Sequence, residues 1–350
     1  MFVNARLALF ISVASHSNMH FFVTWAAGRG RIVRKSIFLV VAAVLLPTFA
    51  AAQRPVEWDK VQVKTQKLDE NVYLLQFLGP EGPGENVGGN VGALISDEGI
   101  AIVDCGYAPA APKLEAALKA ISDKPVKYLL NTHWHGDHTG ANVYFGKSAV
   151  IIAQDNARKK MERGGGLFPP SPAVALPAIT FDDRFTLRMK VGDILGVHFD
   201  HGHTDTDTIY FFPGAKVVQT GDDFVNWSPP GFPAIEMDND GSGGVDGQIS
   251  ADEYILAHAP ADVKIIPGHG NLATRDDLVK MLAVLKETRA VVQAGINQGK
   301  SLDQLKQEKV LAKWDYLNES HHIQSDVYLE RLYKTLSAKK NAAAGRNKAN

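Results

Sequence analysis

Asn131-Thr-His-Trp-His-Gly-Asp-His-Thr139 is the stretch of sequence that decides the fold. Within six residues it places three histidines and one aspartate, which are His133, His135, Asp137 and His138. Imidazole and carboxylate groups gathered so closely are costly to place unless a cation holds them, and together they suit zinc or another borderline divalent metal. The alternative is a polar loop that happens to be rich in histidine. The spacing and the downstream sequence favour a metal site.

The cluster follows a predicted strand at residues 126–130, and α/β sheets tend to place their chemistry at the carboxyl ends of strands. Three further residues share a position at a strand end with a glycine beside it, which allows close approach of the backbone to an ion. They are His203, just before the predicted strand 208–212, Asp222, just after 216–219, and His269, just after 263–266.

Each of these three residues has an ordinary interpretation when taken alone. His203 and His269 could be hydrogen-bonded loop histidines, and Asp222 could be a helix cap or a turn residue. Beside the cluster, however, the set amounts to five imidazoles and two carboxylates. That number suits two metal ions that leave positions open for water and substrate.

The motifs His-X-His-X-Asp-His, Gly-His-Thr, Gly-Asp and Pro-Gly-His-Gly occur in an order that closely resembles the metallo-β-lactamase fold superfamily, over residues 58–300. The resemblance implies an α+β fold, a four-layer αββα sandwich of two mixed β-sheets flanked by helices, with the metal site at one edge between the sheets. It also implies a ligand for each motif position. His133, His135 and His203 would bind one metal, Asp137, His138 and His269 would bind the second, and Asp222 would bridge both.

These ligands predict a dinuclear zinc hydrolase, with iron or manganese as alternative metals. A water shared by two Zn²⁺ ions is largely hydroxide at neutral pH, because the cations stabilise the deprotonated form. We expect this hydroxide to attack the carbonyl of a small amide, lactam, lactone or ester, with Asp137 as the catalytic residue that orients or shuttles the proton. Asp104 and Thr204 are candidates to orient a ligand histidine by contacting the ring nitrogen that does not bind metal. The alternatives are a plain turn carboxylate for Asp104 and a cap for Thr204.

The chain departs from the β-lactamases within this superfamily. Many of them carry cysteine or serine where this chain has Asp222, and one large group has a lysine three residues later, where this chain has Val225. An aspartate bridge is more similar to glyoxalase II, lactonases and other hydrolases. A glyoxalase II-type thioesterase is therefore an alternative to a β-lactamase. A mononuclear iron sulfur dioxygenase of the same fold and a non-catalytic metal-binding module are further alternatives, and the intact ligand set counts against both.

The first 52 residues resemble a targeting segment. They hold five basic residues and no acidic ones, and a basic run at 31–35 precedes an apolar run at 36–49 and three alanines at 50–52. The apolar run is shorter than the roughly 20 residues of a membrane span. We expect an N-terminal extension and signal peptide over 1–52 and a periplasmic or secreted enzyme; an uncleaved anchor is the alternative. Export also disfavours glyoxalase II, because glutathione thioesters are mainly cytosolic.

The remaining sequence predicts a single domain over 53–337 and a disordered tail over 338–350, which is small, polar and basic. Predicted strands and helices alternate in an order that suggests two sheets packed face to face, with helices outside. The net charge of −1 argues against nucleic-acid binding. We expect a small-molecule substrate, no nucleic-acid partner and no membrane attachment once the signal is removed. Trp134, Phe168 and Trp227 are candidate walls for the substrate, although ordinary packing is the alternative.

Residues 238–253 have the composition of a calcium-binding loop. Their second half fits positions 5 to 12 of an EF-hand, but the first and third ligands would then be Ser242 and Gly244. A loop that starts at Asp238 instead puts Ile249 where the bidentate glutamate belongs. We therefore expect no Ca²⁺ at 238–253, but an acidic, glycine-rich loop that caps the following helix.

Overall fold

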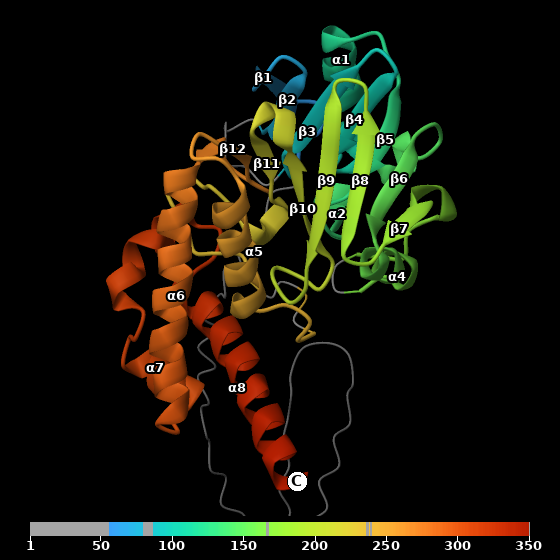
Figure 1. Ribbon diagram of the computed structural model, residues 1–350. Helices are drawn as coiled ribbons and strands as arrows, with labels where there is room; N and C mark the ends of the chain where they lie inside the picture. The colour runs from blue at the N-terminus through green and yellow to red at the C-terminus, as the bar shows by residue number, and fades with distance from the viewer. Residues whose placement is uncertain (1–55, 80–86, 166–167, 236–237, 239, 350) are drawn as a thin grey trace, which may run out of the picture. The chain divides into compact units, whose positions relative to one another are not determined.

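Two mixed β-sheets dominate the computed structural model, which describes residues 56–79, 87–165, 168–235, 238 and 240–349 (Figure 1). The described residues belong to one compact unit, Arg54–Asn350. The expected leader at 1–52 lies outside the described residues and stays a prediction.

The first sheet has seven strands in chain order, of which β1 to β4 pair antiparallel and β4 to β7 pair parallel. Its parallel half is connected through helices α1 (Ala111–Ile121) and α4 (Asp155–Arg163) and the short turns α2 (Gly136–Thr139) and α3 (Asn142–Phe145). The strands are β1 (Gln62–Lys67), β2 (Val72–Leu78), β3 (Val91–Ser96), β4 (Gly99–Val103), β5 (Val126–Leu130), β6 (Val150–Gln154) and β7 (Ile179–Phe181).

The second sheet has six strands in the order β13-β12-β11-β10-β9-β8. The expected hairpin at 208–212 and 216–219 is confirmed, because β10 and β11 pair antiparallel, with Tyr210 opposite Gln219. β12 pairs parallel to β11, which brings the loops after both strands to the same edge of the sheet. The strands are β8 (Arg184–Met189), β9 (Gly192–Phe199), β10 (Asp207–Phe212), β11 (Val217–Gln219), β12 (Lys264–Ile266) and β13 (Ala273–Thr274).

Successive side chains of a strand point to opposite faces of its sheet, so each sheet has an inner face and an outer face to cover. The inner faces share one core, in which Leu74 and Leu130 of the first sheet join Phe212 of the second. On the outer face of the first sheet, Leu114 of α1 belongs to the cluster around β4. On the outer face of the second, Ile255 of α5 (Val245–His258) belongs to the cluster around β10 (Figure 1). The expected four-layer αββα sandwich is therefore confirmed.

The C-terminal helices form a further cluster against α5 and the segment around Phe232. They are α6 (Arg275–Asn297), α7 (Leu302–Gln307) and α8 (Ser325–Ala349). The prediction of a disordered tail from residue 338 differs from this structure, because α8 continues to Ala349. Alanine and lysine dominate that tail, and both have high helix propensity. None of the described helices is both long and apolar enough to cross a bilayer.

Candidate metal centre

The seven residues predicted as ligands come together at one edge of the sandwich, in the turns that adjoin four strands. β5 leads into the turn that carries four of them, and β11 and β12 lead into Asp222 and His269. His203 lies in the connection between β9 and β10. These side chains form two groups, and within each group the possible ligand atoms all lie within 4.8 Å of one another. One group is His133, His135 and His203, and the other is Asp137, His138, Asp222 and His269.

In the first group, the inward-facing ring nitrogens converge while the outward-facing nitrogens are held by oxygen atoms. His203 Nε2 lies 3.1 Å from His135 Nδ1, and His133 Nε2 is buried with no hydrogen-bond partner. On the outer side, His133 Nδ1 is 3.0 Å from Thr132 Oγ1, and His203 Nδ1 faces the carbonyl oxygen of Ala234. Such outer contacts set the tautomer and orientation of metal-binding imidazoles.

In the second group, two imidazoles face two carboxylates. His138 Nε2 lies 3.2 Å from His269 Nε2, which in turn lies 3.1 Å from Asp137 Oδ2. Asp222 presents its two oxygens to different groups. Its Oδ1 is 3.2 Å from His138 Nε2, and its Oδ2 is 3.4 Å from His203 Nε2 of the first group. Asp222 therefore adjoins both groups.

The two groups differ in their electrostatics. Burial and the neighbouring imidazoles lower the pKa of His133 well below its usual value, and burial lowers the pKa of His203 to about 4. In the second group burial also disfavours the imidazolium, but the carboxylates of Asp222 and Asp137 outweigh it. They raise the pKa of His269 to about 9, and the pKa of His138 well above its usual value. Without a metal, protons therefore supply the positive charge, and an ion that binds here must displace them.

Asp104 lies directly behind both groups. It follows β4 in a left-handed conformation (φ 63°), which aspartate tolerates better than most residues. Its Oδ2 lies 2.8 Å from His138 Nδ1, and its two oxygens accept hydrogen bonds from the backbone N and the Oγ1 of Thr132. Since Thr132 Oγ1 also contacts His133, one carboxylate supports a histidine in each group.

Within the part of the chain that the structure describes, Thr204 makes no such contact with a ligand histidine; it is a local cap. Its Oγ1 donates to Asp207 Oδ1 at 2.6 Å, and its backbone N donates to Asp207 Oδ2. The next carboxylate, Asp223, accepts a hydrogen bond from His203 N at 3.1 Å. Burial raises the pKa of Asp223 to about 7.

The structure also brings residues to the centre that sequence reasoning missed. Asp238 Oδ1 lies 2.7 Å from His135 Nε2, and its Oδ2 accepts a hydrogen bond from Trp134 Nε1. The acidic stretch around Asp238 was the only signal for it, and its composition pointed to calcium instead. Trp134 itself is buried in an apolar cluster with Ala157 and Met161, so ordinary packing applies to it.

Aromatic rings flank the centre on both sides. Phe168 lies 5.1 Å from the ring of His135, and Trp227 stacks on His269 with 5.3 Å between ring centroids. His322, from the C-terminal segment, stacks on Trp227 at 3.6 Å. All three aromatic residues expected as walls adjoin candidate ligands, because the ring of Trp134 also lies 5.3 Å from that of His135.

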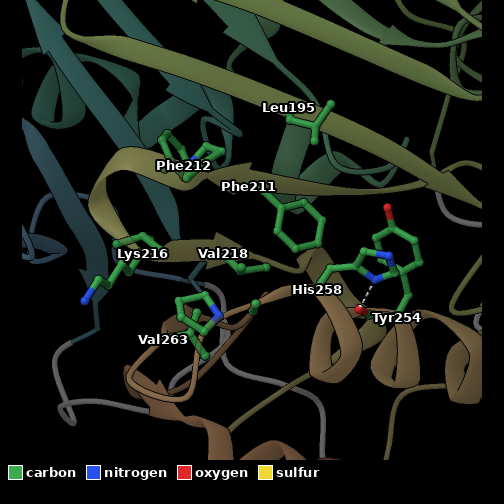
Figure 2. A pocket seen from close by; sticks show the side chains of 12 residues that line it. Leu195, Phe211, Phe212, Lys216, Val218, Tyr254, His258 and Val263 are labelled. Carbon is green, nitrogen blue, oxygen red and sulfur yellow. Dashed lines mark hydrogen bonds between the residues drawn. The ribbon is translucent and has the colours of Figure 1, made fainter.

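A separate cavity of about 380 Å³ lies away from this centre, between β10, β11 and the end of α5. Figure 2 shows the aromatic rings of Phe211, Tyr254 and His258 around it, with Val218 and Val263 nearby. None of the candidate metal ligands lines it.

Comparison with known proteins agrees with this geometry. A family model described as the metallo-beta-lactamase superfamily matches residues 84–280. Among solved structures, a metallo-beta-lactamase from Pontibacter korlensis aligns with a TM-score of 0.52 and 17% identity, covering 64% of this chain and 99% of that one. The DIM-1 metallo-beta-lactamase aligns with a TM-score of 0.52 and 18% identity, covering 65% and 99%. At this identity the structural likeness shows the fold alone.

Proposed function

Because the chain belongs to the metallo-β-lactamase superfamily and is a metal-dependent hydrolase, we propose that it is a dinuclear zinc enzyme that hydrolyses a small amide, lactam, lactone or ester. The observation that carries the proposal is the pair of ligand groups with Asp222 between them.

The donor atoms fit zinc. Three imidazoles face one position, and two imidazoles with two carboxylates face the other, a mixture of nitrogen and oxygen that suits zinc and, less selectively, iron or manganese. The buried His133 Nε2 has no hydrogen-bond partner among the described residues. A bound cation would satisfy this atom, and it would offset the cost of leaving it buried and unpaired.

When bound, two zinc ions would supply an electrophile for the substrate carbonyl and a water of lowered pKa. The residues of the chain then have distinct tasks. Asp137 is the most exposed of its group, with 14% of its side chain accessible. Burial disfavours its charged form, but the nearby imidazoles of His138 and His269 lower its pKa. Its Oδ2 is therefore ionised and can accept a hydrogen bond that orients a water molecule. Phe168 and Trp227 would bind the apolar part of the substrate and exclude water.

Val225 limits the range of substrates that the site can be expected to bind. This side chain is 1% exposed and packs in the C-terminal cluster, so it offers no cation to a substrate carboxylate. Recognition by apolar contact with Phe168 and Trp227 favours substrates that do not depend on a cation at that position, such as lactones and neutral esters. β-Lactams remain candidates, as does a thioester.

Metal analysis followed by a substrate screen tests the proposal. Purified protein should hold about two zinc ions per chain, and the zinc-loaded protein should hydrolyse a lactone, a thioester or the β-lactam nitrocefin. The Asp137→Ala variant should lose most of that hydrolysis. Metal content well below one equivalent, with no gain on adding zinc, would refute a zinc enzyme. Oxygen uptake with a persulfide substrate would instead support the mononuclear iron alternative.

We also propose that residues 1–52 direct export and are removed at about residue 52, on the strength of their sequence. Expression of the full chain in a bacterium, followed by fractionation and N-terminal sequencing, tests this. A mature protein in the periplasmic fraction that begins near Gln53 is the expected result, whereas an intact chain in the cytosol would contradict it.

A further inference from the structure

Lys160 is a buried lysine that the proposed chemistry does not use. It lies on α4, only 7% of its side chain is exposed, and its ammonium sits among three carboxylates. Its Nζ is 2.7 Å from Asp205 Oδ1 and 3.3 Å from Asp240 Oδ2, and it also contacts Asp238. The hydroxyl of Ser242 is 2.9 Å from the same atom.

These oxygen ligands are of the kind that a calcium ion would take. Asp238, Asp240 and Ser242 follow the alternating spacing of the first ligands of a calcium loop. In this structure the cation that they surround is the ammonium of Lys160. The calcium-like composition of the stretch therefore has a physical explanation that needs no ion. Unlike an ion, a lysine cannot dissociate from the chain.

The ammonium is connected to the metal centre through one carboxylate. Asp238 contacts Lys160 through Oδ2 and faces His135 Nε2 through Oδ1 at 2.7 Å. An imidazole that donates from Nε2 to a carboxylate keeps its other nitrogen free for a metal. In His135 that nitrogen is Nδ1, which points at His203 Nε2 of the first group. The orientation of Asp238 thus decides which nitrogen of His135 is presented.

We propose that Lys160 is a built-in cation that holds Asp238, Asp240 and Ser242 beside the metal centre and positions His135 through Asp238. The inference rests on the zinc centre proposed above. Without the ammonium, the carboxylates of Asp205, Asp238 and Asp240 would repel one another, and the buried Asp238 would be the least screened by water. Asp238 would then turn toward solvent, and His135 would lose the acceptor that sets its tautomer. Although burial disfavours the charge, Asp205 and Asp238 raise the pKa of Lys160 above its usual value.

Substitution of Lys160 tests the proposal through zinc affinity, measured by competition with a chromophoric chelator. Lys160→Met should weaken the binding of one of the two zinc ions by about 10- to 100-fold. This is the usual effect of removing a residue that orients a metal ligand. The matched control is Lys159→Met, because the neighbouring Lys159 is exposed and its ammonium donates to Asn156 Oδ1 at 3.1 Å on the surface of the helix. The zinc affinity of this control should equal that of the wild type for both ions. Unchanged zinc affinity in Lys160→Met would overturn the proposal.

A double-mutant cycle separates positioning from general stability. If Lys160 acts through Asp238, the double variant Lys160→Met, Asp238→Asn should bind zinc no more weakly than Asp238→Asn alone. Losses of zinc affinity that add up in the double variant would contradict this coupling. A fall in the melting temperature of the metal-free protein, without a change in zinc affinity, would show that Lys160 supports only the fold.

Lys160→Gln keeps hydrogen-bond donors at the same place without the charge, and it serves where the Met variant fails to fold. It should also weaken the binding of one zinc ion, and a zinc affinity equal to that of the wild type in Lys160→Gln would overturn the proposal. A wild-type protein that binds no zinc refutes the proposed function instead. The two failures are therefore distinguishable.

Discussion

The Asp104→Asn substitution probes the support that both ligand groups share. Asp104 is fully buried and accepts three hydrogen bonds, at 2.8 Å from Thr132 N, 2.7 Å from Thr132 Oγ1 and 2.8 Å from His138 Nδ1. Asparagine has the same size and tolerates the left-handed backbone, but one of its two terminal atoms is a donor. In either orientation at least one buried donor loses its acceptor, which costs about 1–3 kcal/mol.

Two measurements follow from this estimate. The melting temperature of chelator-treated Asp104→Asn should fall by several degrees, because about 1 kcal/mol shifts the midpoint of a domain of this size by roughly 2–4 °C. Its affinity for one zinc ion should fall by about 10- to 100-fold, because in either orientation of the amide His138 loses the charged acceptor behind it. The control is Asp97→Asn, an exposed aspartate in the turn before β4. Wild-type melting and wild-type zinc affinity in Asp104→Asn would refute the reasoning.

Three further results are expected. Asp222→Ala should lower zinc content and reduce hydrolysis by more than the roughly 100-fold typical of a supporting residue, because it removes an oxygen from both groups; activity near that of the wild type would exclude a bridging role. The pKa of His269 is raised to about 9 in the folded protein. Its contribution to the stability of the metal-free protein should therefore be complete below about pH 6.5 and should be lost as the pH rises through 9. Melting temperatures that stay flat from pH 6 to 10 would contradict this, and zinc affinity should rise with pH over the same range. His322→Asn should raise KM several-fold with unchanged zinc content, because it removes the ring that stacks on Trp227. The neighbouring His321→Asn is the control. Equal KM values in the two variants would show that His322 does not help to line the substrate site.

The candidate ligands were predictable because their placement is local. Four of them lie in one turn, and the others follow or precede short strands beside glycines, so residue type and spacing were enough to propose two half-sites. The αββα layers were predictable for a similar reason, since alternating strands and amphipathic helices can bury their apolar faces only against one another.

The contacts behind the ligands were not predictable. His135 and Asp238 are 103 residues apart, and Lys160 and Asp238 are 78 residues apart. Their meeting depends on how α4 and the segment before α5 pack around the same edge. Composition alone suggested that the acidic stretch binds calcium or nothing, because it does not reveal that a distant lysine supplies the charge.

The sequence by itself therefore determined which side chains can hold metal and in which order they occur. Only the tertiary structure decided how each imidazole is oriented, because the orienting carboxylates of Asp104 and Asp238 come from other parts of the chain. It also decided that the C-terminal segment contributes His322 to the rim of the site. The physical reason is that metal-ligand types are a local property of residues, whereas hydrogen-bond partners of buried groups are chosen by packing.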